Sequence, residues 1–306
     1  MTLERFGIQA VRAIDRVTDI AIEIVLCVML LFGAYSLWDS NRVYQQADAA
    51  RYAAYRPSAE DTASFDELRA INPEVFAWLT VNDTPIDYPM TQTGDNEKYI
   101  NTNAEGAYTL SGSIFLDYRN SPAFDDFNSI VYGHHMEKKR MFGSLSDFAD
   151  REYFDSHPYG NLFFNGKDHG IQFFALVLTD AYDKVLFTPV TDPAARQTFL
   201  QYALDSAMYR RDVPVSTDDQ IIELSTCTST ITNGRYMLIG KLTDETYLQP
   251  EEAPKVNLGT GLTSREYGLL GMPLWIWICA GAVLLALLWI VVRTVTGRNR
   301  PEKKGS

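Results

Sequence analysis

Two apolar segments near the ends of the chain restrict where a water-soluble domain can fold. Residues 20–38 are apolar apart from a few polar positions such as Glu23. Residues 269–292 contain no charged residue and lead into the basic tail 293–306. Each segment approaches or exceeds the ~20 residues that an α-helix needs to cross a bilayer. The soluble domain is therefore expected between them.

Basic residues outside the two apolar segments predict the topology. Arg5, Arg12 and Arg16 precede the first segment, and the basic tail follows the second. Because basic flanks stay in the cytoplasm, both termini are expected there, with the middle of the chain outside the cell membrane. A cleavable signal peptide is the alternative for the first segment. No small-x-small cleavage site closely follows its apolar core, so an uncleaved anchor in a two-pass protein is favoured.

The changes in composition along the chain define a domain plan. The spacing between the membrane segments leaves room for a large core. The expected parts are a cytoplasmic N-terminus (1–19), a transmembrane helix (20–38), a helical stalk (39–64), a barrel domain (65–248), a linker (249–268), a transmembrane helix (269–292) and a basic cytoplasmic tail (293–306).

Short strands separated by turn signals dominate the barrel domain. The expected strands are 75–81, 86–90, 113–116, 129–132, 161–164, 171–178 and a pair within 221–242. Many short strands predict a mainly β fold, a closed or nearly closed antiparallel barrel that leaves no exposed edges. Helical insertions are expected at 150–156 and at 192–210, where Asp192 is the N-cap and Pro193 the first helical residue.

The acidic balance of the chain excludes one class of function. The formal net charge is −12, and because the C-terminal tail is basic, the remainder is more acidic still. Nucleic-acid binding needs clustered Lys and Arg, so no nucleic-acid partner is expected. No Asp-x-Asp-x-Asp-Gly calcium loop occurs either. The sequence therefore predicts neither a metal requirement nor a cofactor.

The stretch 221–242 places two reactive side chains at one end of a strand pair. Two apolar runs flank an Asn233-Gly234 turn signal, with Cys227 at the end of the first and Arg235 at the start of the second. If the runs pair as antiparallel neighbours, the thiol and the guanidinium emerge at the same end of the sheet. A cation beside a thiol favours the thiolate and can hold an oxyanion.

Cys227 is the only cysteine outside the two apolar segments, which contain Cys27 and Cys279. No disulfide can form within the barrel domain, so a lone thiol there is a candidate nucleophile. The polar flanks and the nearby Arg235 favour that interpretation. The alternative is a buried core cysteine at the end of a strand.

A cysteine nucleophile needs a proton partner, and the chain has four histidines. His157 and His169 lie in polar turns and are expected to be solvated. His134 and His135 follow the strand 129–132 and Gly133. Alternation along a strand puts them on opposite faces, and periodicity does not decide which face carries the site.

A set of motifs, taken together, resembles the sortase family and most closely its class B. They occur in order through nearly the whole domain between the membrane segments: NPEVFAWLTVNDTPIDYP, GSIFLDYRN, SIVYGHHMEKKRMFGSL, Tyr182-Asp183, and LSTC ending at Cys227 with Arg235 opening the next strand. The insertion at 192–210 matches one typical of class B. The resemblance implies a closed β-barrel of about eight antiparallel and mixed strands, with flanking and inserted helices.

The resemblance also implies roles for individual residues. The family's cysteine, histidine and arginine fall on Cys227, His134 and Arg235. Substrate-binding positions are expected at Ser225, Thr226, His135 and Tyr182; ordinary strand packing is the alternative role for Ser225 and Thr226. The cysteine would cleave a sorting pentapeptide after threonine through a thioacyl enzyme, and the histidine would move the proton.

The partners implied are proteins that bear a sorting signal, or pilins, and an amine acceptor. A cell-wall precursor as acceptor gives surface-protein anchoring, and a pilin lysine gives pilus polymerisation. Anchoring is favoured, although the second apolar segment at 269–292 is more usual in pilus-building sortases. Two rival classes are a membrane-tethered cysteine hydrolase and a noncatalytic surface adhesin.

Overall fold

The structure, a computed structural model, describes residues 3–57, 62–228 and 230–247, together with residues 277, 281 and 285. The chain divides into a compact unit, Arg42–Glu252, and a second unit made of Met1–Asn41 and Ala253–Ser306. The predicted linker 249–268 and tail 293–306 lie outside the described residues. So does the predicted second membrane segment, 269–292, apart from its three single residues.

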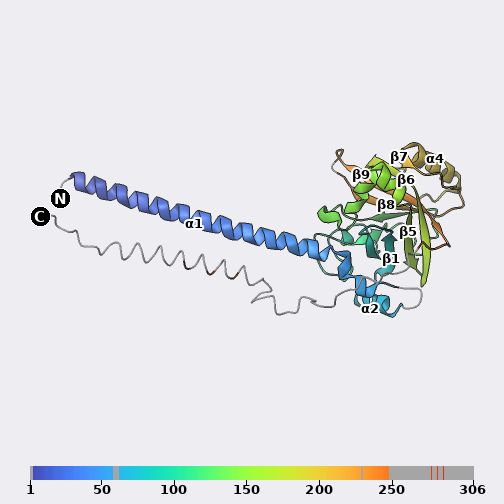
Figure 1. The fold of residues 1–306 in the computed structure, drawn as a ribbon, viewed down its shortest axis with the longest axis horizontal. Helices are drawn as coiled ribbons and strands as arrows, with labels where there is room; N and C mark the ends of the chain where they lie inside the picture. Colours follow the sequence, from blue (N-terminus) through green and yellow to red (C-terminus); the bar gives the residue numbers. More distant parts are fainter. Residues whose placement is uncertain are drawn as a thin grey trace. The chain divides into compact units, whose positions relative to one another are not determined.

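The first apolar segment forms part of a long helix, α1 (Leu3–Gln46; Figure 1). Within it, Val11–Gln46 is long and apolar enough to cross a membrane, judged by length and composition. That property fits a membrane anchor or a signal sequence. The predicted span 20–38 lies inside this helix.

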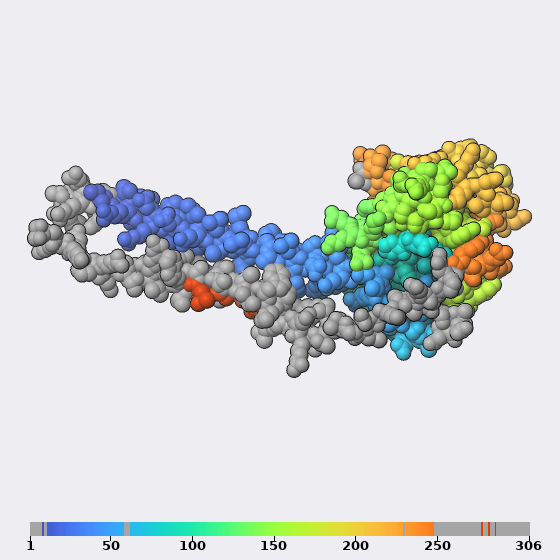
Figure 2. All heavy atoms as spheres, viewed as in Figure 1, coloured from blue at the N-terminus to red at the C-terminus, as the bar shows by residue number. Residues whose placement is uncertain are grey.

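The residues after α1 belong to the compact unit, and part of the stretch 39–64 packs on the barrel. Two short 3₁₀ helices follow α1, η1 (Ala49–Arg51) and η2 (Ala53–Tyr55). Ala47 and Tyr52 are buried in the barrel core. In Figure 2 the blue atoms of this stretch lie against the rest of the compact unit. Burial of these apolar side chains draws the stretch onto the barrel.

Eight strands of a nine-stranded sheet close into a ring. The strands are β1 (Val75–Val81), β2 (Asp87–Thr91), β3 (Ile114–Leu116), β4 (Asn128–Tyr132), β5 (Tyr159–Phe164), β6 (Lys167–Asp180), β7 (Ala207–Arg210), β8 (Ile221–Cys227) and β9 (Gly234–Thr243). Their order is β5-β1-β2-β3-β4-β8-β9-β6-β7, and an additional β5–β6 pairing closes the ring, leaving β7 outside it on β6. The predicted eight-stranded barrel is confirmed.

The barrel is mixed. Strands β2 and β3 run parallel, as do β4 and β8, and the other pairs are antiparallel. The β8–β9 hairpin fills the place between β4 and β6, which lie far apart in the sequence from one another. A parallel neighbour therefore runs alongside the strand that ends at Cys227.

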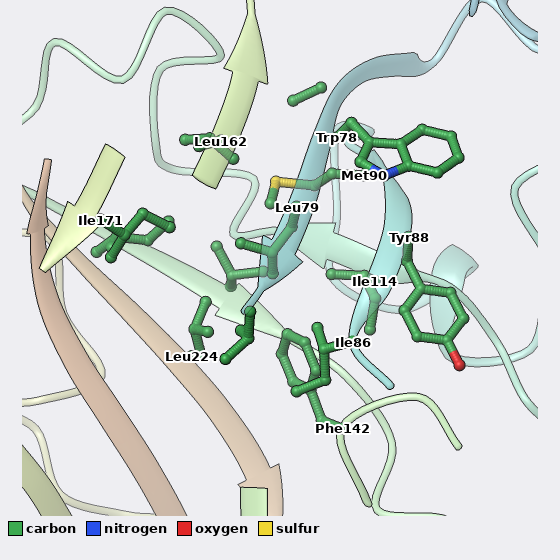
Figure 3. Packing of buried hydrophobic residues seen from close by; sticks show 14 of the residues in the cluster. Trp78, Leu79, Ile86, Tyr88, Met90, Ile114, Phe142, Leu162, Ile171 and Leu224 are labelled. Atoms are coloured by element: carbon green, nitrogen blue, oxygen red, sulfur yellow. The ribbon is translucent and has the colours of Figure 1, made fainter. Parts of the chain in front are cut away.

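The strands β8 and β9 are buried on both faces, which explains their continuous apolar runs. Ile222, Leu224 and Leu238 belong to the cluster inside the barrel. Figure 3 shows side chains from several strands meeting there, including Leu79, Met90, Ile114, Leu162, Ile171 and Leu224. On the opposite face, Ile221 and Ile239 pack in a second cluster with side chains of α4 (Arg196–Asp205). Cys227 and Arg235 alternate onto this second face.

Helices interrupt the strand order close to the expected positions. They are α2 (Ala63–Ile71), η3 (Lys98–Ile100), η4 (Glu137–Lys139), η5 (Gly143–Ala149), α3 (Arg151–Ser156), η6 (Pro193–Ala195) and α4. Asp192 caps η6 as predicted, its side chain accepting from the Ala194 amide.

The predicted helix 192–210 is wrong at its C-terminal end. The helix α4 ends at Asp205, and Ala207–Arg210 forms strand β7 against β6. Pairing with the edge of β6 outweighs the helix propensity of this sequence.

Candidate active site

Cys227 and Arg235 meet at one end of the β8–β9 hairpin. They are direct partners in the antiparallel register, as the sequence predicted. Cys227 is the last residue of β8 and is exposed, whereas Arg235 is half-buried. Asn233, in the left-handed conformation with a φ of 55°, supplies the turn before β9.

The parallel pairing of β4 with β8 brings His134 to the same place. Tyr132, the last residue of β4, lies opposite Ser225. Beyond it, the Gly133 amide donates to the Ser225 carbonyl at 3.2 Å, and the Thr226 hydroxyl donates to the Gly133 carbonyl at 2.8 Å. A Cβ on Gly133 would lie 2.6 Å from Ile114 and Phe142 side-chain atoms, so glycine is required there. These bonds hold His134 beside the end of β8.

The structure distinguishes the two adjacent histidines that periodicity left open. His134 is half-buried and lines the cleft that also contains Cys227 and Arg235. His135 is exposed, forms an isolated bridge with Met141 and is not among the residues that line this cleft.

A backbone carbonyl sets the orientation of the His134 ring. The imidazole Nε2 lies 2.8 Å from the Ile100 carbonyl oxygen. A carbonyl oxygen can only accept, so Nε2 carries the proton and donates it to this bond. In the neutral ring Nδ1 is then the basic nitrogen. The tautomer of His134 is thus fixed by its neighbour.

The cleft has a volume of about 480 Å³. Its lining comes from β3, β4, β8, β9 and the loops beside them: Asn96, Ile100, Phe115, Arg119, Tyr132, Gly133, His134, Ala181, Phe187, Ser225, Thr226, Cys227 and Arg235. A thiol, an imidazole and a guanidinium therefore share one solvent-accessible cavity, the set of groups that acyl transfer through sulfur requires.

The predicted substrate-binding residues are divided by the structure. Ser225 and Thr226 line the cleft, although each is 2% exposed. Tyr182 is 78% exposed and is not among the lining residues, whereas its neighbour Ala181 is. The cleft thus contains Ser225 and Thr226 but neither His135 nor Tyr182.

One wall of the cleft is built on the buried carboxylate of Asp117. Arg119 donates to it from Nε at 2.8 Å and from a terminal nitrogen at 2.7 Å. Tyr132 and Asn96 donate to its Oδ2 at 3.0 and 2.9 Å. Burial alone would raise the pKa of Asp117, but these hydrogen bonds, led by those from Arg119, hold it below its ordinary value.

The loop between β6 and η6 contributes Phe187 to a second part of the cleft wall. Phe187 stacks on Tyr132 with ring centroids 6.4 Å apart and an interplanar angle of 11°, and its carbonyl accepts from Arg119 at 2.8 Å. Asn128 secures the next residues, because its Oδ1 accepts from the Val190 amide at 2.7 Å. The two parts of the wall are therefore linked through Arg119.

Reasoning from the sequence missed several lining residues: Asn96, Ile100, Phe115, Arg119, Tyr132, Ala181 and Phe187. A signal was present for three of them, and one of these is Phe115, which lies in the motif GSIFLDYRN. Arg119 lies in the motif GSIFLDYRN, and Tyr132 shares a strand face with His134 by alternation. Phe187 lies in a loop without periodicity, so only tertiary contacts reveal it.

Among the described residues, no group of three or more His, Cys, Asp or Glu side chains is placed to hold a metal ion. The cleft itself presents one imidazole and one thiol.

Comparison with known proteins identifies the class of enzyme that this fold and cleft belong to. Sortase B of Listeria monocytogenes is 34% identical over 178 residues, which are 58% of this chain and 72% of the relative. No family model matches the chain. The likeness defines a cysteine transpeptidase of the sortase type.

Solved structures agree on the particular family. The chain resembles sortase B from the type II pilus of Streptococcus pneumoniae (43% identity, TM-score 0.53, 59% of this chain and 99% of that one). It also resembles a Streptococcus pyogenes class B sortase involved in pilus biogenesis (39%, TM-score 0.55, 59% and 98%). A Staphylococcus aureus sortase B–substrate complex is similar as well (28%, TM-score 0.54, 58% and 84%). The chain belongs to the sortase B family.

Proposed function

We propose that this class B sortase is anchored in the cell membrane, cleaves a sorting pentapeptide after threonine and transfers the acyl group to an amine. The supporting observation is the single cleft lined by Cys227, His134 and Arg235. Within the family, the Staphylococcus aureus enzyme has been captured in a substrate complex. A peptide substrate in this cleft fits that precedent.

In the first half-reaction, the Cys227 thiolate attacks the threonine carbonyl carbon and forms a tetrahedral intermediate. The carbon–nitrogen bond then breaks, and His134, which starts as an imidazolium with a second proton on Nδ1, gives that proton to the departing amine and leaves a thioester. In the second half-reaction the acceptor amine attacks the thioester and loses a proton to His134, the carbon–sulfur bond breaks, and a new amide forms. Sulfur and imidazole return to their starting states.

Arg235 stabilises the oxyanion of both tetrahedral intermediates. One terminal nitrogen donates to the Gly234 carbonyl at 2.9 Å, which fixes the guanidinium at the start of β9. A guanidinium has five N–H donors, so others are available to a substrate oxygen. Ser225 and Thr226 form the adjacent part of the groove.

The acyl donor is a surface protein that carries a C-terminal sorting signal, and the favoured acceptor is an amine of a cell-wall precursor. Attachment of surface proteins to the cell wall follows. His135 and Tyr182 contact the peptide outside the cleft, since neither is among the residues that line it.

Pilus polymerisation is the second candidate. Two similar structures, those from Streptococcus pneumoniae and Streptococcus pyogenes, are of sortases associated with pili, at 43% and 39% identity. In that case the acceptor amine is a pilin lysine, and the chemistry at Cys227 is unchanged.

The proposed topology has both termini in the cytoplasm, 20–38 and 269–292 across the membrane, and residues 65–248 as the extracellular catalytic domain. The apolar character of α1 supports the first span. Protease added to intact cells should remove the catalytic domain and spare tags at both termini. Digestion of the C-terminal tag would contradict the second span.

Mass spectrometry of a trapped acyl enzyme tests the reaction. Full-length protein in detergent is incubated with a pool of peptides that end in candidate pentapeptides. We expect a mass increase on Cys227, loss of that adduct in Cys227→Ala, and new products when an amine is added. Cleavage that survives Cys227→Ala would overturn the proposal, and products unchanged by the amine would indicate a hydrolase.

A second variant pair separates chemistry from binding. His134→Ala and Arg235→Lys should each reduce the rate of acyl-enzyme formation by about 100-fold or more, because each removes a group used in the transition state.

A separate experiment with the wild-type enzyme distinguishes the two candidate acceptors. Either a pilin lysine peptide or a cell-wall precursor is supplied as the amine, and the one that yields the new amide is the acceptor.

A further inference from the structure

The connection that carries His134 has an unusual backbone. Between β4 and η5, residues 133–142 include Lys138, Lys139 and Met141 with φ values of 56°, 58° and 52°. Non-glycine residues rarely adopt this left-handed region, and such conformations persist only where surrounding contacts hold them. Within the connection, the Phe142 amide donates to the His134 carbonyl at 3.0 Å. The backbone of His134 is therefore tied to the strained residues.

The end of α1 and the two residues after it hold this connection in place. We name residues 44–48 the helix-end segment. The Tyr44 hydroxyl donates to Glu137 Oε2 at 2.8 Å, and the Lys138 ammonium lies 4.4 Å from the centre of the Tyr44 ring. Arg140 forms a two-bonded ion pair with Asp48, at 2.8 and 2.6 Å. In Figure 2 the green atoms of the connection lie against the blue end of α1.

A buried tyrosine extends the same support to Met141. The Tyr88 hydroxyl donates to the Ala47 carbonyl at 2.8 Å and accepts from the Met141 amide at 3.0 Å. Ala47 and Tyr88 are almost fully buried. Because the Tyr88 hydroxyl is both donor and acceptor, it ties the helix-end segment to the third left-handed residue of the connection.

The helix-end segment is also linked, through Thr109, to the residue that follows the carbonyl orienting the His134 ring. Gln46 Oε1 accepts from the Thr109 hydroxyl at 2.7 Å, and the Thr109 amide donates to the Asn101 carbonyl at 3.0 Å. Asn101 directly follows Ile100, whose carbonyl accepts from His134 Nε2. One five-residue segment therefore supports both the backbone of His134 and the partner of its imidazole.

We propose that the helix-end segment, residues 44–48, is a positioning element of the active site that sets the place and orientation of His134 for proton transfer. The proposal rests on His134 acting as the general acid and base. The ion pair Arg140–Asp48 is the strongest contact between the helix-end segment and the connection, since it consists of two charge-assisted hydrogen bonds.

The test uses the full-length chain in detergent with the peptide that acylates Cys227 in the screen above. Arg140→Ala and Asp48→Ala are each expected to lower kcat about 10- to 100-fold while KM changes less than two-fold, because displacing a catalytic group affects the transition state more than binding. The double variant should be no worse than either single variant. The exchanged pair Asp48→Arg with Arg140→Asp should recover most of the activity.

The matched control is the exposed pair Arg151–Asp155, which has a bond of 2.8 Å and lies outside the cleft lining. Arg151→Ala should leave kcat within two-fold. A kcat for Arg140→Ala that also stays within two-fold would overturn the proposal. The proposal would also be overturned if the loss of kcat in Arg140→Ala disappeared at temperatures below the melting transition of the variant, because the loss would then reflect partial unfolding and not displacement of His134.

A second measurement needs no peptide. The rate of Cys227 alkylation by iodoacetamide is followed against pH by peptide mapping, in wild type, Arg140→Ala and His134→Ala. Besides His134, the charged or titratable side chains that line the cleft are Arg119, Tyr132, Cys227 and Arg235. Displacement of His134 should shift the Arg140→Ala profile toward that of His134→Ala.

An Arg140→Ala profile identical to wild type, where that of His134→Ala differs, would refute the positioning role even if no peptide were found. Failure of every peptide to acylate Cys227 would instead count against the proposed function. The two failures are therefore distinguishable.

Discussion

Two buried carboxyl groups near the cleft, Asp117 and Glu223, differ in whether a cation reaches them. Both side chains are fully buried. Asp117 is paired with Arg119, and its pKa is held below the ordinary value despite burial. Glu223 accepts one hydrogen bond from Asn128 at 2.7 Å, and its Oε2 has no partner among the described residues. Burial, with a smaller contribution from Asp183, raises its pKa to about 8.

The difference shows how one site uses both states of a carboxyl group. The ionised Asp117 fixes a guanidinium in the cleft wall. The protonated Glu223 supports Asn128, which holds the loop after Phe187, without placing a negative charge beneath Cys227 on its own strand. Two carboxyl groups that are both shielded from solvent thus have pKa values shifted in opposite directions, because hydrogen bonds led by those from Arg119 outweigh burial at Asp117 whereas burial dominates at Glu223.

The largest effect is expected for Asp117→Ala. Removing the carboxylate leaves Arg119, Tyr132 and Asn96 without their shared acceptor, so the free energy of unfolding should fall by about 3–5 kcal/mol. Urea unfolding of the full-length protein at pH 7 measures this. A loss under 1 kcal/mol would mean that the wall does not depend on the carboxylate.

The same variant should change the response to acid. Because the folded pKa of Asp117 lies below the unfolded value of about 3.9, its contribution is present above that pH and is lost as the pH falls further. Wild type should therefore lose stability below about pH 4 more steeply than Asp117→Ala. Parallel curves would contradict the assignment.

Glu223→Gln is expected to have a smaller effect of opposite sign. The unfolded carboxyl loses its proton near pH 4.5, whereas the folded one keeps it until about pH 8, so wild type loses stability as the pH rises between these values. The glutamine variant lacks this slope. It should match wild type at pH 4.5 and exceed it by about 2–4 kcal/mol at pH 8, as measured by urea unfolding.

Arg119→Lys should cost about 1–2 kcal/mol of stability. An ammonium keeps the charge beside Asp117 but cannot make the two-bonded contact and also reach the Phe187 carbonyl. Thermal unfolding measures the loss. Arg119→Lys should still lose stability below about pH 4 as wild type does. If that loss disappeared, the two-bonded guanidinium contact rather than the positive charge would be what lowers the pKa of Asp117.

The smallest effect is expected where an ion pair is exposed. Asp155→Ala removes the pair with Arg151 on α3, and because both side chains are exposed the loss of stability should be the smallest of the series at low salt and smaller still at 1 M salt. A loss as large as that for Asp117→Ala would remove the distinction between buried and exposed carboxylates drawn here.

Much of the barrel could be predicted because its signals are local. Strand 75–81 was predicted with its observed bounds, and the Asn233-Gly234 turn was enough to make Cys227 and Arg235 partners. The end of α4 could not be predicted, since β7 forms only against the edge of β6. Helix propensity carries no information about that edge.

The site itself was less predictable because it depends on long-range pairing. Alternation left His134 and His135 equivalent, and the parallel register of β4 on β8 separates them. Glu223 stands in an apolar run, where the sequence does not reveal its charge state. The pKa of Glu223 is raised because its side chain is buried on the face of β8 that packs in the second core cluster. Among the described residues that influence this pKa, none is a cation.

Closure of the ring ties enzymatic competence to the completion of folding. Strands β4 and β6 precede the β8–β9 hairpin in the chain, and without that hairpin each would have an open edge able to pair with another chain. Docking of the hairpin fills that gap and, in the same event, delivers sulfur to imidazole. A barrel that lacks the docked hairpin therefore cannot be acylated by substrate, and formation of the acyl enzyme indicates that the ring of strands is complete.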